Sequence, residues 1–489
     1  MELYIIGFGP VAGYKYSRCI HDAVQNGYLQ RYHVIDRESQ QQVVEGRLSK
    51  LPLQPASCTY IPDHVLQHGT DAGIEWLDQQ QIFARSEWRK IKVVICTEPQ
   101  THEAYIRYAL GRQFDVLVTK PMVLPMKNGI FDYEGLLPNV DAMAKLATDA
   151  GVNTGMICLG RLHEIYETKL RQPMALMVDR LQSPITSVHV KTASGVWNLA
   201  SEFFSRDDHP YKFGYGMLMH GAYHYIDVLA GLLLLNRKLF PDDDLVLTLK
   251  GFSAGPYDQQ SRIGKLDRRT AGYQQELSEL KEGVPYGETD IVASYALKFR
   301  ATGKVLTLGT IGLEQTTPGM RSWGPFPEVP YNVNGRLHCT DIDARIGTAF
   351  SINANVTKHP IQARMGDSDI RGVNSGTVVT RSNARLTQTQ GFIRHETFER
   401  PYGNSYSYSA EAELFEGWVL GKPSQSDFAS HVPSCAILAG LLKLAANDWS
   451  GDVEMDFNYP APDRPASSVE YDPWYDYMSN TSITFSSEN

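Results

Sequence analysis

The sequence predicts an α/β domain with a parallel sheet over residues 1–155, followed by an α+β domain with a large, mostly antiparallel open sheet over residues 156–447. Two observations support this. Apolar strand-like runs alternate with helical stretches up to residue 159, which is typical of parallel strands joined by right-handed crossovers. Beyond that point long strand-like segments follow one another with few helices between them. Residues 448–489 are rich in Pro, Asp, Tyr and Ser and predict a C-terminal tail on the surface.

The first element is a short apolar strand, Leu3–Ile6, followed by a glycine turn. The turn, Gly7-Phe8-Gly9-Pro10-Val11-Ala12, fits the pattern G-x-G-x-x-G/A. In that pattern the first glycine permits a tight turn, the second lets the backbone approach a pyrophosphate, and the third small residue lets the helix pack on its strand. A helix from about residue 11 to 26, ended by Gly27, would point its free N–H groups at the phosphates. The turn predicts a Rossmann-type dinucleotide-binding domain; the alternative is a doubly wound sheet that binds no dinucleotide.

The second strand, residues 32–35, stops at Asp36. An acid at the tip of this strand is where a ribose diol is held, and its charge disfavours a 2′-phosphate. Arg37 can stack on adenine or accept that phosphate. We therefore expect NAD as the cofactor, with NADP as the alternative.

The hydrophobic pattern of the sequence is weak over residues 37–90, where we expect irregular structure with short helices. A clear pattern returns at residues 92–96, which predict a buried strand. The next strand, 114–118, ends in Thr119-Lys120-Pro121. Because strand ends of open parallel sheets face the ligand crevice, Lys120 is a candidate active-site residue rather than a surface lysine. The other expected elements of this half are helices at 103–110 and 139–150 and a strand at 152–159.

In the second half one apolar helix, residues 216–235, carries His220 and His224, which are one turn apart and share a face. Such a pair can bind zinc, but spacing supplies no third ligand, so we expect no metal. The remaining expected elements are strands at 185–192, 245–252, 290–300 and 305–309, further strand structure at 339–355 and 376–385, and helices at 411–421 and 432–447.

Bulk properties exclude several classes of protein. The formal net charge of −9 argues against a nucleic-acid partner. The six cysteines form no C-x-x-C pair, which argues against a zinc ribbon or disulfide scaffold and fits the reducing cytoplasm. The start of the chain lacks the basic residues of a signal peptide, and the longest apolar run, Val228–Leu235, is too short to span a bilayer. We expect a cytoplasmic protein without a membrane partner.

Four segments in order resemble the Gfo/Idh/MocA family of oxidoreductases, which includes inositol dehydrogenase and glucose–fructose oxidoreductase. They are the glycine turn, Thr97–His102 (similar to T-P-x-x-x-H), Thr119–Pro121 (similar to E-K-P) and Gly216–Asp227 (similar to G-x-L-x-D-x-G-x-H-x-x-D). A later segment, Ala412–Gly421 followed by a proline, also looks like the family. The match covers roughly residues 1–447. It implies a Rossmann domain and a large open sheet with the active site between them.

The resemblance also implies roles for individual residues. Lys120 would hydrogen-bond the reacting oxygen, and His224, with His220 nearby as a third catalytic candidate, would exchange its proton. The chain departs from the family at His220, where the family has an aspartate, at Thr119 in place of a glutamate, and at Glu98 in place of a proline. The cofactor would contact Gly7, Phe8, Gly9, Pro10, Val11, Ala12, Asp36, Arg37, Thr97, Glu98, Pro99, His102 and Lys120. The candidate residues lining the substrate cleft are Arg161, His163, Lys191, Trp197 and Tyr223.

The expected function is hydride transfer between NAD(P) and a hydroxyl or keto carbon of a sugar, cyclitol or related polyhydroxylated compound. Two alternatives stay open: an NAD-dependent glycoside-cleaving enzyme on the same scaffold, and a non-catalytic dinucleotide-binding protein. Since an open sheet leaves one face without helices, we also expect a homo-oligomer, a dimer or a tetramer. The chain is longer than typical family members around residues 256–287 and 316–375.

Overall fold

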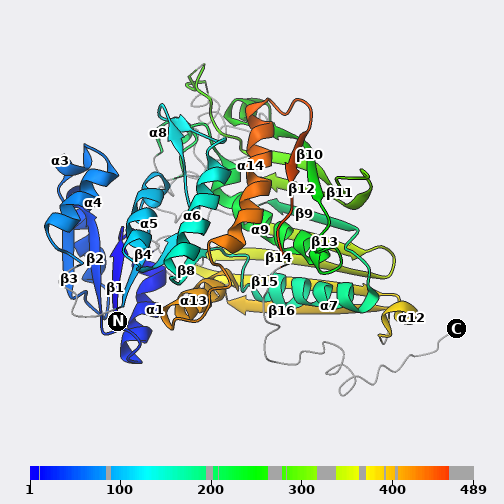
Figure 1. Ribbon diagram of the computed structural model, residues 1–489, viewed down its shortest axis with the longest axis horizontal. Helices are drawn as coiled ribbons and strands as arrows, with labels where there is room; N and C mark the ends of the chain where they lie inside the picture. The colour runs from blue at the N-terminus through cyan, green and yellow to red at the C-terminus, as the bar shows by residue number, and fades with distance from the viewer. Residues whose placement is uncertain are drawn as a thin grey trace.

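The computed structural model describes residues 1–9, 12–83, 90–193, 202–206, 209–262, 278–281, 283–316, 338–362, 370–389, 392–401 and 406–461. In this part of the chain a six-stranded parallel sheet lies beside a nine-stranded, mostly antiparallel sheet (Figure 1). The predicted fold class is confirmed.

The parallel sheet has the strand order β3-β2-β1-β4-β5-β8. Its central strands β1 and β4 are buried along their whole length, which explains their apolar runs Leu3–Ile6 and Val93–Ile95. The strand order reverses direction at β1, where such sheets open a ligand crevice beyond the carboxyl ends of the strands. The bounds are β1 Glu2–Ile6, β2 Arg31–Arg37, β3 Ser57–Ile61, β4 Ile91–Ile95, β5 Asp115–Thr119 and β8 Thr154–Ile157.

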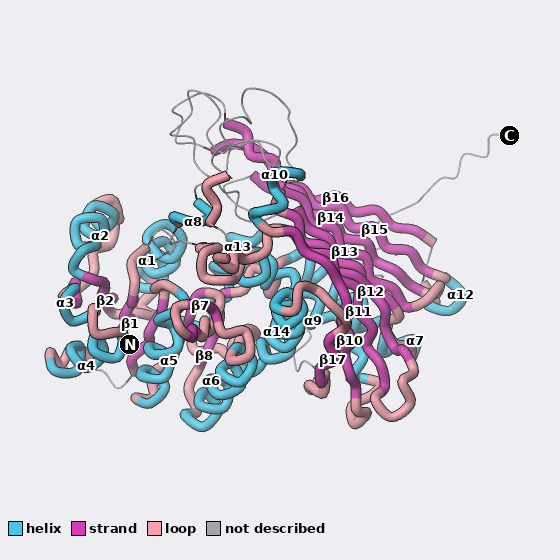
Figure 2. Tube along the Cα trace, turned by 90° about the horizontal axis from the view of Figure 1, so that it is seen from above, coloured by secondary structure: helices cyan, strands magenta, loops and turns pink. Residues whose placement is uncertain are grey.

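Helices on both faces of this sheet complete the doubly wound arrangement, with α1 and α2 on one face and α4, α5 and α6 on the other (Figure 2). After the glycine turn the chain forms a π-helical turn, η1 (Ala12–Tyr16), which runs into α1 (Ser17–Gln25). Positive φ angles of 74° at Gly27 and 65° at Gly151 end α1 and α6, as the sequence predicts. The other elements here are η2 Glu38–Gln40, α2 Gln41–Leu48, α3 Asp63–Leu66, α4 Thr70–Gln79, η3 Pro99–Thr101, α5 His102–Gly111, the hairpin β6 Met126–Lys127 and β7 Ile130–Phe131, and α6 Leu136–Ala150.

The segment expected to be irregular contains one strand, β3, which pairs in parallel with β2 at the edge of the sheet. An edge strand is covered on one side only, and four of the five β3 residues are partly or fully exposed. It therefore lacks the apolar run by which a buried parallel strand is found in a sequence.

The second sheet has the order β16-β15-β14-β13-β9-β12-β11-β10-β17. All neighbouring pairs are antiparallel except β9 with β12. The range 339–355 holds parts of two strands, β13 and β14, which a turn at Gly347 (φ 51°) connects. The bounds are β9 Ser187–Ala193, β10 Leu245–Ala254, β11 Asp290–Phe299, β12 Val305–Glu314, β13 His338–Ile346, β14 Phe350–Gln362, β15 Ile370–Ser382, β16 Ile393–Pro401 and β17 Val453–Asp456.

The two outer strands of this sheet differ from the sequence prediction. No strand was expected at β16, and β17 lies inside the expected C-terminal tail, where Val453–Asp456 pair with β10. The expected tail thus contains a strand, and its residues 462–489 lie outside the described residues.

One face of the nine-stranded sheet is covered by helices, and no helix of the described residues covers the other, which is called the bare face below (Figure 2). The covering elements include a continuous helical segment, η5 (Leu218–Ala222), α9 (Tyr223–Leu233) and η6 (Leu234–Lys238), together with η4 Glu164–Arg171, α7 Gln172–Leu181, η10 Ala429–His431 and α14 Val432–Ala446. On the bare face Phe252, Val292 and Leu308 are exposed. The smaller helices are α8 Glu202–Ser205, η7 Pro256–Asp258, α10 Gln259–Arg262 and α12 Ala384–Thr387.

Two helical segments, Leu218–Lys238 and Ala429–Ala446, are long and apolar enough to cross a bilayer by length and composition alone. In the structure 83% and 67% of their most apolar windows are buried inside the protein. Burial of this extent is typical of core helices, and here the apolar faces pack against the nine-stranded sheet.

A late helix, α13 (Tyr406–Val419), returns to the parallel-sheet domain. Phe415 stacks on Tyr16 with ring centroids 5.3 Å apart. Trp418 is buried beneath the Lys92 ammonium, which pairs with Asp115 at 2.7 Å. Helix α13 therefore packs on the parallel-sheet domain, although it lies far along the chain from residues 1–155.

Candidate active site

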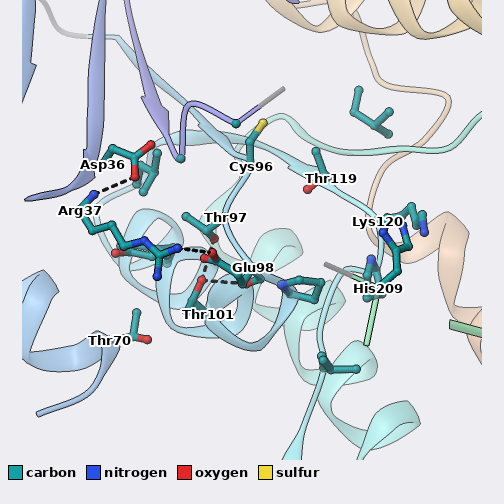
Figure 3. Close-up of a pocket in the computed structure, with 18 of the residues that line it drawn as sticks. Asp36, Arg37, Thr70, Cys96, Thr97, Glu98, Thr101, Thr119, Lys120 and His209 are labelled. Atoms are coloured by element: carbon teal, nitrogen blue, oxygen red, sulfur yellow. Dashed lines mark hydrogen bonds and ion pairs between the residues drawn. The ribbon is translucent and has the colours of Figure 1, made fainter. Parts of the chain in front are cut away.

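A cavity of about 820 Å³ runs along the carboxyl ends of the parallel strands, between the two domains. Figure 3 shows Asp36 and Arg37 at one end and Lys120 and His209 at the other. The cavity lies at the sheet edge where the strand order predicts a ligand crevice. It brings together these members of the predicted site: Gly7, Gly9, Asp36, Arg37, Thr97, Glu98, Pro99, Lys120, His220 and His224.

The glycine turn has the geometry that its motif requires. Gly7 has a φ of +85°, and a Cβ there would stand 2.8 Å from the backbone of Cys96 and Thr97, so no other residue fits. A Cβ at Gly9 would meet no atom within 4 Å, although Gly9 is on the cavity wall. The bare backbone at Gly9 thus leaves room for a group as close as a pyrophosphate. Pro10 and Val11 lie outside the described residues.

Phe8 and Ala12 stabilise this turn through side-chain packing and backbone hydrogen bonds. Both side chains are fully buried in the core of the parallel-sheet domain. The backbone N–H of Phe8 donates to Asp36 Oδ2 at 2.7 Å, and its carbonyl accepts from Arg47 Nη1 at 2.9 Å. Arg47, from α2, also lines the cavity and brings a positive charge to the turn.

Asp36 is held by two backbone donors at the end of β2. Oδ2 accepts from Phe8 and Oδ1 accepts from the N–H of Arg37 at 2.8 Å. Burial raises the pKa of Asp36, and these two hydrogen bonds oppose that rise. Since each carboxylate oxygen can accept a further bond, the pair fits a ribose diol. The Arg37 guanidinium is 3.3 Å from Glu98 Oε1, and this ion pair leaves it less suited to a 2′-phosphate.

One residue of the cavity wall, Tyr16, has a buried hydroxyl without a hydrogen-bond partner among the described residues. An orphaned buried hydroxyl beside the glycine turn is the kind of group that a bound ligand satisfies. With the open backbone at Gly9 and the Asp36 carboxylate, it shows that the residues present fit a dinucleotide.

His102 does not line the cavity, although the sequence places it in the cofactor site. Its ring is fully buried, with Nδ1 2.7 Å from the Pro121 carbonyl and Nε2 3.0 Å from the Thr97 carbonyl. Burial lowers its pKa. His102 therefore ties the turn after β4 to the Lys120–Pro121 segment after β5 and positions both.

Lys120, His220 and His224 meet at the other end of the cavity. Lys120 Nζ donates to the backbone carbonyl of His220. The His220 ring makes edge contacts with the rings of His209, Tyr211 and Tyr215, with centroids 4.9–5.4 Å apart. Within the described ranges, no group of three or more His, Cys, Asp or Glu side chains is arranged to hold a metal ion.

The His224 ring is oriented by backbone. Its Nδ1 accepts a hydrogen bond from the N–H of Leu159 at 3.2 Å and lies 3.6 Å from Cys158 Sγ. A neutral imidazole carries one proton, so a ring that accepts at Nδ1 has its N–H at Nε2. The other ring nitrogen, Nε2, is therefore a hydrogen-bond donor.

A buried polar network supports the helix that carries these histidines. Asp227 forms a bidentate ion pair with Arg161, with contacts of 2.9 and 2.6 Å, and accepts from Ser434 Oγ at 2.7 Å. Burial alone would raise the pKa of Asp227, but the Arg161 guanidinium holds it well below its usual range. His431, 3.4 Å from Asp227, has a pKa lowered to about 4, mainly by burial and then by the charge of Arg161.

The four predicted substrate residues that the structure describes do not line the cavity. Arg161 belongs to the buried network, and the Tyr223 hydroxyl is 2.9 Å from His431 Nδ1. His163 is buried and stacked on Tyr166, with a pKa lowered to about 3, first by burial and then by nearby cations. Lys191 is exposed on the bare face of the nine-stranded sheet, and Trp197 lies outside the described residues.

Several lining residues escaped the sequence analysis. Arg47 lies in the stretch where the sequence pattern is weak, and Glu411 arrives with α13 from far along the chain. His209 lies in a loop before η5 and has a φ of +54°. No sequence motif predicts this left-handed backbone conformation. These residues are recognised as site residues only because the folded chain brings them to the same cavity.

No family model matches the chain, and a search of curated proteins finds no match. Solved structures do resemble it. An oxidoreductase domain protein from Kribbella flavida is 13% identical with a TM-score of 0.54, and the match covers 93% of this chain and 98% of that one. An oxidoreductase from Agrobacterium radiobacter in complex with NAD+, L-tartaric acid and magnesium is 13% identical with a TM-score of 0.50, covering 94% and 98%. The WlbA dehydrogenase from Chromobacterium violaceum, in complex with NADH and UDP-GlcNAcA, is also 13% identical with a TM-score of 0.50, covering 94% and 97%. At these identities the similarity shows a shared fold.

Proposed function

We propose that this chain is an NAD(P)-dependent oxidoreductase of the Gfo/Idh/MocA type. It would transfer a hydride between nicotinamide and a hydroxyl or keto carbon of a small polyhydroxylated compound such as a sugar or cyclitol. The observation that carries the proposal is one continuous cavity. It joins Asp36 and the glycine turn at one end to Lys120, His220 and His224 at the other.

The solved structures of the same fold support this proposal. The two from Agrobacterium radiobacter and Chromobacterium violaceum are described with NAD+ and NADH, respectively. The second also holds a nucleotide-linked sugar acid. For the present chain the cofactor preference is NAD, because Asp36 offers both carboxylate oxygens to a diol and Arg37 is paired with Glu98.

The chain's own residues would hold the cofactor and the reacting oxygen. A bound nicotinamide dinucleotide supplies the hydride acceptor or donor. Gly9 leaves the backbone open to the pyrophosphate, Asp36 accepts from the ribose, and Arg47 adds positive charge near the turn. At the other end the Lys120 ammonium would stabilise negative charge on the substrate oxygen.

His224 would act as a hydrogen-bond donor to the same oxygen. Nδ1 is occupied by the N–H of Leu159, so Nε2 carries the proton of the neutral ring. His224 could take up a second proton only at Nδ1, after that bond breaks. We therefore assign the proton exchange to Lys120, whose amine form can accept the hydroxyl proton, rather than to His224, to which the family resemblance assigns it.

The decisive experiment measures binding of NAD, NADH, NADP and NADPH to purified protein by calorimetry or nicotinamide fluorescence. NADH formation is then followed across a panel of sugars, cyclitols and sugar acids. We expect tighter binding of NAD(H) than of NADP(H) and turnover of at least one compound. Failure to bind any of the four nucleotides would refute the proposal.

The same panel separates the two alternatives. An enzyme that uses bound NAD transiently to cleave glycosides would release a phenol from an aryl glycoside without net NADH formation. A non-catalytic protein would bind the nucleotide tightly and turn over no compound of the panel.

We further propose a homo-oligomer that buries the bare face of the nine-stranded sheet, because Phe252, Val292 and Leu308 are exposed there. A cytoplasmic location is proposed from the cysteines. All six are described, and none forms a disulfide.

A further inference from the structure

We infer that Glu98 is a second determinant of cofactor specificity: its carboxylate occupies the guanidinium of Arg37, which would otherwise bind the 2′-phosphate of NADP. The inference rests on the proposed function and concerns the end of the cavity at Asp36. It goes beyond the contact of Asp36 with a ribose diol, because it assigns a latent phosphate site to Arg37 and a blocking role to Glu98.

The turn after β4 fixes the backbone of Glu98 beside the cavity. The Glu98 carbonyl accepts from the N–H of Thr101 at 2.9 Å and lies 2.9 Å from Thr101 Oγ1. Pro99 follows directly and keeps Glu98 in the extended conformation, with φ −63° and ψ 139°. Strands β4 and β2 flank β1 on either side, so this turn and the end of β2 lie at the same edge of the sheet. The Glu98 side chain therefore starts from one defined position, facing the end of β2.

Arg37 reaches this turn from the last position of β2. Figure 3 shows its side chain extending towards Glu98, and Arg37 Nη2 is 3.3 Å from Glu98 Oε1. The two side chains are 46% and 60% exposed, and a solvated ion pair of this kind opens at little cost. A phosphate could therefore displace the carboxylate from the guanidinium. Because the backbone of Glu98 is fixed, the displaced carboxylate would stay close to that phosphate and repel it.

A 2′-phosphate at this end would meet two carboxylates. Burial is the main cause that raises the pKa of Asp36, and the charge of Glu98 adds to the rise. Both carboxylates also act on Tyr105, which lines the cavity and has a pKa raised to about 12, first by burial and then by Asp36 and Glu98. The charge of Glu98 is thus felt at the position where Asp36 accepts from the ribose.

Without the Glu98 carboxylate, the same end would suit a phosphate. Arg37 and Arg47 are the described cations on this part of the cavity wall, and arginine binds phosphate through charge-assisted, often bidentate hydrogen bonds. Arg47 donates to the carbonyl of Phe8 in the glycine turn, beside the expected pyrophosphate. Arg37, at the tip of β2, is therefore the cation placed to receive a group on the adjacent ribose.

The test compares ADP-ribose with 2′-phospho-ADP-ribose by calorimetry, for the native protein and E98Q. These probes lack nicotinamide, so they report on this end of the cavity alone. We expect E98Q to bind the phosphorylated probe on the order of 10-fold more tightly than the native protein does, with a smaller change for ADP-ribose. The gain should shrink as salt is added, because exposed charges are screened. An E98Q protein with no gain for the phosphorylated probe would overturn the inference.

A double-mutant cycle tests the assignment of the phosphate to Arg37. R37Q should remove the gain in the E98Q background and have a smaller effect when Glu98 is present. E103Q is the matched control, because Glu103 forms a 2.7 Å ion pair with Arg107 on α5 and does not line the cavity. It should change neither affinity. A gain that persists undiminished in E98Q/R37Q would also overturn the inference, since the phosphate would then bind without Arg37.

These outcomes are separable from failure of the proposed function. A protein that binds neither the nicotinamide nucleotides nor the two probes refutes both. A protein that binds NAD and turns over a substrate, but gains no affinity for the phosphorylated probe in E98Q, keeps the proposed function and loses this inference.

Discussion

Replacing Arg161 with methionine should destabilise the protein strongly and leave the cavity intact. Arg161 is buried and donates five hydrogen bonds: two to Asp227, two to the backbone carbonyls of Gln425 and Ser430, and one to the Ser430 hydroxyl. A methionine side chain fills much of the volume of the aliphatic part of Arg161 but donates none of these five hydrogen bonds. The change leaves the Asp227 carboxylate buried without its cation.

The expected loss is about 3–5 kcal/mol of unfolding free energy, the cost of breaking a buried ion pair by removing one partner. Ser434 and His431 still contact Asp227, which keeps the loss from being larger. R112M is the matched control. Arg112 pairs with Asp78 at 2.6 Å on the surface, with 45% and 38% of the two side chains exposed, so its loss should cost less than about 1 kcal/mol.

The pH dependence has a definite sign. In the native protein the pKa of Asp227 is depressed, so this pair contributes stability above the unfolded carboxyl pKa, and that stability is lost as the pH falls through the folded value. In R161M burial dominates and raises the Asp227 pKa above the unfolded value. The variant then gains stability from protonation at low pH, and its deficit relative to the native protein should be smaller at pH 5 than at pH 8.

Urea or guanidinium denaturation at both pH values measures these differences, with NADH affinity as a check on the folded variant. Because Arg161 does not line the cavity, NADH affinity should stay close to that of the native protein. An R161M protein with native stability and impaired substrate binding would refute the reasoning and return Arg161 to the substrate site.

Four further predictions concern the site and the assembly. D36A should weaken NAD binding more than NADP binding, because it removes two acceptors for the diol and the repulsion of a 2′-phosphate; equal losses in a titration of both nucleotides would contradict this. K120M should keep cofactor affinity and lose about 10²-fold or more in turnover. H224Q, which can still donate a hydrogen bond, should retain more activity than H224L; equally inactive variants in steady-state assays would restore a proton-exchanging role for His224. Light scattering at micromolar concentration should show a dimer or tetramer, and a monomer mass would reject burial of the bare sheet face.

The sequence alone is sufficient to predict the site residues at the ends of the buried parallel strands. Gly7 and Lys120 directly follow strands with clear apolar runs, and Asp36 follows the short apolar pair Val34–Ile35. The topology of a parallel sheet brings such positions to one edge. The edge strands β3, β16 and β17 were missed because a half-exposed strand has no continuous apolar run. A strand of four residues, such as β17, is defined by its partner β10 more than by its own sequence.

The roles of the other site residues were decided by tertiary structure. Arg161 and Tyr223 have residue types that suit a sugar site, but the packing of α9 and η10 directs both side chains into a buried polar network. His209 and Glu411 reach the cavity from a loop and from α13, more than 80 residues from Lys120 in the chain. A local pattern reports which face of an element is apolar, but the direction of a polar side chain depends on what packs against that element. The strand-end half of this site was therefore predictable, and the half built from helices and loops became visible only in the folded chain.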